Sequence, residues 1–175
     1  MTLSSDSKIR RLTTDACFLA AAMLLSYIEA VFPIIPTIPL PGFKIGLSNL
    51  AILTAAYRCS PFDAAVISLG RIILTFLIFG NPTSLLFSLF GGALVIIGLW
   101  LIIRTDISSS FSFVGLSVMC AFLHNLGQLI AAFILMGDAV LSYIPPLIAA
   151  SIIYGGINGI ILCVLPPQIY RKKSN

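Results

Sequence analysis

Acidic residues are scarce in this chain of 175 residues, and their scarcity excludes several kinds of enzyme site. The six that are present stand apart from one another: Asp6, Asp15, Glu29, Asp63, Asp106 and Asp138. No aspartate pair is therefore available to hold magnesium and diphosphate. The sequence also lacks the GxxxxGKS/T loop that binds nucleotide phosphates and the GxSxG elbow of serine hydrolases. We expect a protein that is not an enzyme.

Histidine and paired cysteines, the usual ligands of zinc, are lacking as well. His124 is the only histidine, and the cysteines are far apart without a CxxC spacing: Cys17, Cys59, Cys120 and Cys163. A zinc site needs three or four such ligands held close together. We predict no metal site and no bound cofactor, with the cysteines serving as small apolar residues inside helices.

Hydrophobic residues dominate the chain instead. They make up 59% of it, charged residues only 9%, and the mean hydropathy is +1.10. A membrane-spanning helix needs about 20 mostly apolar residues, so we predict an all-α integral membrane protein, a six-transmembrane-helix bundle in one domain over residues 1–175. The expected helices, the first of them uncleaved, cover residues 12–32, 45–57, 62–79, 84–103, 113–136 and 143–165. The second is short for a full span.

The basic residues predict the orientation of this bundle. With the N-terminus inside, the cytoplasmic side receives eight of them: Lys8, Arg10, Arg11, Arg58, Arg104, Arg171, Lys172 and Lys173. Lys44 alone falls outside, and Arg71 lies within a span. This asymmetry predicts cytoplasmic termini in a multi-pass protein of the inner (cytoplasmic) membrane. The net charge of +4 is thus a topology signal, and no nucleic-acid partner is expected.

Arg71 is a costly residue in its position near the middle of the third apolar run. Charged side chains at bilayer depth usually face a bundle interior or a cavity and mark a ligand or ion path. Ser68 and Thr75 share its helix face, which is therefore polar. A guanidinium there can bind a carboxylate or phosphate, or it can form an internal ion pair, with Glu29 as one candidate. Both interpretations stay open.

A second polar group lies near the middle of the fifth apolar run. His124 and Gln128 are four residues apart and share a helix face, with Asn125 adjacent. Together they can hydrogen-bond a heterocycle or a carbonyl, or they can clamp neighbouring helices. The sequence does not decide between these roles.

The start of the second helix is a third candidate. Its sequence from Gly42 to Asn49 supplies glycines, the free N–H groups of a helix end and the charge of Lys44. These features favour an anionic or carbonyl-bearing ligand. The alternative is a lysine that reaches the membrane surface beside a tight helix start.

Three segments together resemble a known family: LPGFKIGLSN (40–49), SLFGGAL (88–94) and GLSVMCAFLHNLGQL (115–129). They resemble the Gx transporter family, much of which carries the name heptaprenyl diphosphate synthase component I. That family is similar to the substrate-binding S components of energy-coupling-factor (ECF) vitamin transporters. The resemblance implies an S-component-like bundle, an outward-facing site, and partners comprising a transmembrane subunit and ATPase subunits. It also implies that Ala16 and Ala20, at AxxxA spacing, contact the transmembrane subunit.

The leading hypothesis is a membrane substrate-binding subunit for uptake of a small vitamin-like or anionic solute, energised by separate ATPase subunits. Its predicted site residues are Lys44, Asn49, Arg71, His124, Asn125 and Gln128. The alternative is an accessory membrane subunit of a flavin- or quinone-linked redox or isoprenoid pathway complex. In that case the polar residues inside the membrane would only clamp helices.

Overall fold

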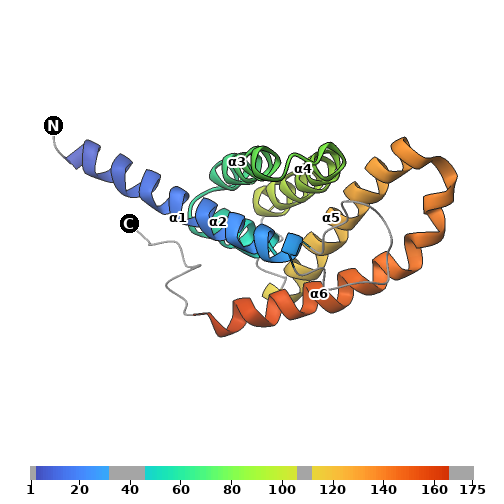
Figure 1. The fold of residues 1–175 in the computed structure, drawn as a ribbon. Coiled ribbons are helices and arrows are strands. Elements are labelled where there is room, and N and C mark those ends of the chain that lie inside the picture. The colour runs from blue at the N-terminus through green and yellow to red at the C-terminus, as the bar shows by residue number, and fades with distance from the viewer. Residues whose placement is uncertain (1–2, 32–45, 106–111, 166–175) are drawn as a thin grey trace.

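The computed structural model describes residues 3–31, 46–105 and 112–165, and the regular structure in these ranges is helical (Figure 1). The helices are α1 (Leu3–Val31), α2 (Asn49–Arg58), α3 (Pro61–Phe79), α4 (Pro82–Arg104), α5 (Phe113–Met136) and α6 (Ile144–Val164). A 3-10 helix, η2 (Gly137–Tyr143), joins α5 to α6. The predicted all-α class is confirmed.

Four stretches of the described residues are long and apolar enough to cross a membrane: Lys8–Val31, Pro61–Phe79, Pro82–Arg104 and Phe113–Val164. The last contains α5, η2 and α6. The chain is thus a multi-pass membrane protein by length and composition. The count of six spans stays a prediction, because α2 has ten residues and reaches only about 15 Å at 1.5 Å per residue.

Short polar signals set the ends of the central helices. The Ser60 side chain accepts a hydrogen bond from the backbone N–H of Asp63 and starts α3, and Asn81 starts α4 in the same way through Ser84. These caps satisfy backbone donors that a helix start would otherwise leave unpaired. Gly80 ends α3 with a φ of 63°, a left-handed conformation that glycine adopts without strain.

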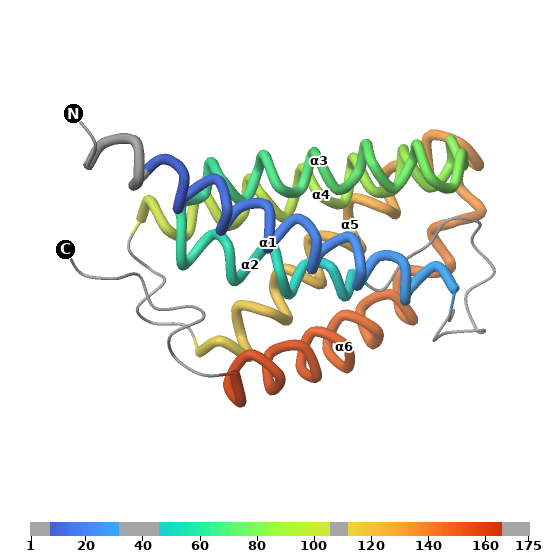
Figure 2. The backbone as a smooth tube through the Cα atoms, turned by 60° about the vertical axis from the view of Figure 1, so that its left-hand side comes forward, coloured from blue at the N-terminus to red at the C-terminus, as the bar shows by residue number. Residues whose placement is uncertain are grey.

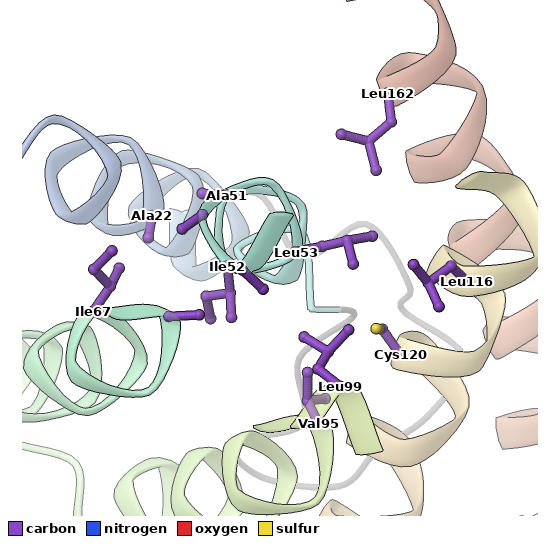
Figure 3. Close-up of a cluster of buried hydrophobic side chains, with 13 residues drawn as sticks. Ala22, Ala51, Ile52, Leu53, Ile67, Val95, Leu99, Leu116, Cys120 and Leu162 are labelled. Atoms are coloured by element: carbon purple, nitrogen blue, oxygen red, sulfur yellow. The ribbon is translucent and has the colours of Figure 1, made fainter. Parts of the chain in front are cut away.

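Helix α2 lies in the middle of the bundle and packs against α1, α3, α5 and α6. Its residues from Ala51 to Ala56 are all buried. In Figure 3, Ile52 lies on the side of Ile67 from α3, and Leu53 extends toward Leu116 of α5 and Leu162 of α6. The hydrophobic core therefore surrounds α2 and fixes where its polar first residues lie.

The remaining helices enclose this centre (Figure 2). Helices α3 and α4 run side by side, α5 and α6 form a hairpin through η2, and the start of α1 lies toward the same end of the bundle as the end of α6. Large apolar side chains such as Leu77, Ile134 and Val164 cover the outer surface. A lipid environment suits such a surface, whereas water does not.

Candidate functional site

Arg71 is almost completely buried, at 2% exposure, halfway along α3. Its Nη1 donates hydrogen bonds to the hydroxyl oxygens of Ser48, at 2.7 Å, and Ser26, at 3.2 Å. Ser26 belongs to α1 and Ser48 immediately precedes α2, and both serines are fully buried. The guanidinium is therefore held where α1, α3 and the start of α2 meet.

The other two nitrogens of this guanidinium, Nε and Nη2, have no hydrogen-bond partner among the described residues. A buried donor without a partner costs about 1–3 kcal/mol, and more when it is charged. The sequence left two roles open for Arg71, an internal ion pair with Glu29 or the binding of a ligand. Within the described part of the chain, its hydrogen-bond partners are the two serines and not Glu29.

Glu29 instead binds the backbone at the start of α2. Its Oε1 accepts hydrogen bonds from the N–H groups of Gly46 and of Leu47, the latter at 3.3 Å. Gly46 has a φ of +86°, so the turn favours a residue without a side chain. The N–H groups of Gly46 and Leu47 are therefore not free for a ligand, because the protein supplies its own carboxylate there.

Asn49, the first residue of α2, is buried beside this turn. Neither its amide oxygen nor its amide nitrogen has a hydrogen-bond partner among the residues described. A Cβ added to Gly46 would lie 2.6 Å from Asn49 Nδ2 and 3.1 Å from His124 Cδ2. The Gly46 turn, the Asn49 amide and the His124 ring are therefore neighbours.

The imidazole of His124 is held by α4 and α5. Its Nε2 lies 2.8 Å from Gln128 Nε2, and the tautomer of the ring sets which of the two atoms donates. A Cβ on Gly91 of α4 would lie 2.6 Å from its Nδ1. Only glycine lets α4 approach the ring this closely.

Asn125 faces away from this group, toward α6. Its Nδ2 donates to Ser151 Oγ at 2.8 Å and to the carbonyl of Leu147 at 3.4 Å. Adjacent helix positions differ by about 100° in direction, which explains why Asn125 separates from His124 and Gln128. Asn125 thus joins α5 to α6.

The comparisons with known proteins identify the family. The model of the family described as heptaprenyl diphosphate synthase component I matches residues 18–165. The chain belongs to this family. No curated protein and no solved structure matches it. The matched region contains Arg71 and both of its serine partners, together with Asn49 and His124.

Of the six predicted site residues, the structure places Asn49 and His124 together against the Gly46 turn, with Gln128 bonded to His124. Arg71 binds Ser48, the residue before Asn49. Lys44 lies outside the described residues. The ligand roles of all six stay predictions.

The sequence alone did not point to Ser26 and Ser48 as partners of Arg71. A signal for each was present, because Ser26 is three residues before Glu29 on one helix face and Ser48 lies in the segment that carries the family resemblance. Neither signal names Arg71 as the partner, which is 45 and 23 residues away in the chain.

The predicted contact pair on α1, Ala16 and Ala20, is exposed on the outside of the bundle. Two small side chains one helical turn apart allow another helix to approach closely. Their role toward a partner subunit stays a prediction.

A separate polar cluster lies at the start of α3. Ligand atoms of Asp15, Cys59 and Asp63 lie within 4.8 Å of one another, but Asp63 is already paired with Arg11 and accepts from Ser60. Burial and the charge of Asp15 raise the pKa of the Cys59 thiol to about 11. Because a metal binds the thiolate, this thiol is a poor ligand. The cluster ties α1 to α3.

Proposed function

We propose that this protein is the substrate-binding subunit of a membrane uptake system for a small vitamin-like or anionic solute. One observation carries the proposal: the fully buried guanidinium of Arg71 keeps two nitrogens without partners among the described residues. The buried amide of Asn49, the residue after its partner Ser48, is in the same condition. Buried polar groups in native proteins are nearly always hydrogen-bonded. A solute that supplies the missing acceptors satisfies them.

The location of Arg71 supports binding more than catalysis. The guanidinium stays protonated in proteins and so acts as a hydrogen-bond donor, not as a general base. Its two serine partners are occupied as acceptors of its own bonds. The site therefore holds and orients an anion, and we assign no reaction to it.

Energy for uptake then comes from other chains, because the sequence has no nucleotide-binding loop. In the proposed assembly, an ECF-type transmembrane subunit docks on the face of α1 that carries Ala16 and Ala20. ATPase subunits act from the cytoplasmic side of the inner membrane, where both termini lie in this proposal.

Ligand-dependent thermal stabilisation tests the proposal. The full chain in detergent is heated with vitamins, flavins and prenyl compounds, each supplied at saturating concentration. A ligand at 100 times its dissociation constant stabilises by about 2.7 kcal/mol, a shift of about 5–10 °C for a chain of this size. Arg71→Ala and His124→Ala should reduce the shift, whereas Arg104→Ala, an exposed residue at the end of α4, should not. No shift with any compound contradicts the proposal.

An accessory role in a redox or isoprenoid complex is the second candidate. The bonds of Asn125 to α6 favour it, since they show a polar intramembrane residue serving to join helices. The family description, which refers to prenyl diphosphate synthesis, favours it too. Purification with partners separates the candidates: ATPase subunits support uptake, while flavoproteins or a prenyl synthase support the accessory role.

A further inference from the structure

We infer that the solute carries a carboxylate group, bound side-on by the Nε–H and Nη2–H donors of Arg71. The inference rests on the proposed function and narrows it to a chemical class. It depends on which nitrogens of the guanidinium the protein itself uses.

A guanidinium is planar and has five N–H donors in fixed directions. Nη1 carries two of them, and the structure gives Nη1 two acceptors, Ser26 and Ser48. The nitrogens without partners among the described residues are Nε and Nη2. These two share one edge of the plane, where their N–H bonds are parallel.

Two parallel donors match the two oxygens of a carboxylate, which can accept both in a bidentate pair. Ser26 and Ser48 help to orient these donors by binding Nη1, on the other side of the guanidinium. Because they come from α1 and the start of α2, they hold Nη1 at two points and fix the direction of the open edge. A preorganised edge loses less side-chain freedom when it binds.

The charge of the site favours a single negative charge on the solute. Arg71 is the one buried cationic Lys or Arg among the described residues, and a buried carboxylate, Glu29, already lies near it. Since Glu29 already offsets part of the guanidinium charge, a carboxylate solute adds a single negative charge to the site. A phosphate monoester brings up to two charges, and the excess would be costly away from water.

Asn49 adds a second requirement. Its buried amide offers an acceptor oxygen and a donor nitrogen, and neither has a partner in the described part of the chain. Asn49 lies against the Gly46 turn, whose N–H binds Glu29, the carboxylate near Arg71. A carboxylic acid that also presents a hydrogen-bonding group, such as an amide or hydroxyl, toward Asn49 would satisfy this amide.

Matched pairs of acids and neutral analogues test this inference on the full chain in nanodiscs. The probes are nicotinate and nicotinamide, pantothenate and panthenol, and biotin and biotinamide, with inorganic phosphate as a further anion. Thermal stabilisation should occur with at least one acid and be absent or at least tenfold weaker, by apparent dissociation constant, with its neutral partner and with phosphate. This comparison needs no variant.

Arg71→Lys keeps the positive charge but removes the planar edge. Loss of one charge-assisted hydrogen bond costs about 1.5–3 kcal/mol, so the affinity for the acid should fall by roughly ten- to hundredfold. Arg104→Lys, the same exchange at an exposed site, should leave it unchanged. If Arg71→Lys does not fold, Asn49→Leu provides a second variant. It should weaken the binding of both the acid and its neutral analogue.

The outcomes separate the inference from the proposed function. Equal stabilisation by an acid and its neutral analogue, or stabilisation by phosphate alone, overturns the carboxylate inference and leaves a solute-binding protein. Stabilisation by no probe counts against the proposed function and overturns the inference with it.

Discussion

Replacing Gly155 with alanine should weaken the packing of α6 against α5. A Cβ at this position would lie 2.6 Å from Val118 Cα, 3.0 Å from Ala121 Cβ and 3.1 Å from the carbonyl oxygen of Ser117. Carbon atoms pack best at about 3.5–4.0 Å. Because two of these neighbours are backbone atoms of α5, no side-chain rotation relieves the clash, and the helices must separate by about 1 Å.

The next residue, Gly156, gives a matched control on the same helix. A Cβ there would meet nothing within 4 Å. Each exchange gains about 1 kcal/mol of helix propensity, and this gain cancels when the two variants are compared. The difference between them is then the cost of overpacking, about 1–3 kcal/mol.

Thermal unfolding of both variants in one detergent measures this difference. At about 2–4 °C per kcal/mol for a chain of this size, Gly155→Ala should melt about 2–12 °C below Gly156→Ala. The melting temperature of Gly156→Ala should equal or exceed that of the unchanged protein. Equal melting temperatures for the two variants would refute the close packing of α6 on α5.

Two further predictions concern groups outside the proposed site. Asn125→Leu should lower the free energy of unfolding by only about 1 kcal/mol, because Ser151 keeps its own bond to the Leu147 carbonyl. Solute binding should persist in this variant. A folded variant that no longer binds solute would show that Asn125 belongs to the binding site. Cys59 should react slowly with N-ethylmaleimide at pH 8 and faster as the pH rises toward about 11, because burial and the charge of Asp15 disfavour its thiolate. Asp15→Asn should lower the pKa of Cys59 and speed its labelling, which mass spectrometry measures. An unchanged labelling rate would contradict the influence of Asp15 on Cys59.

The positions of the helices could be predicted from the sequence, because hydropathy and helix-breaking residues act locally. Pro61, Gly80 and Gly137 lie at ends of α3 and α5 in the structure, close to the ranges expected from them. The start of α1 differs most, at Leu3 instead of residue 12. Hydropathy detects only the apolar part of a helix, and this helix continues into a polar segment.

The site was predicted only in part, because its details depend on contacts between distant residues. The burial of Arg71 follows from its position in an apolar run. Its serine partners and the use of Glu29 at the Gly46 turn come from packing of α1 against α2 and α3, which no local pattern encodes. For the same reason, the direction of Asn125 toward α6 became visible only in the fold.

The central claim is that the open edge of Arg71 binds a solute. A density map of the purified chain, prepared with the acid that stabilises it most, tests this claim most directly. Our account predicts a small non-lipid molecule with two oxygens at hydrogen-bond distance from Nε and Nη2. A map in which these nitrogens are bonded to a protein group such as Glu29, with no small molecule beside them, would contradict it.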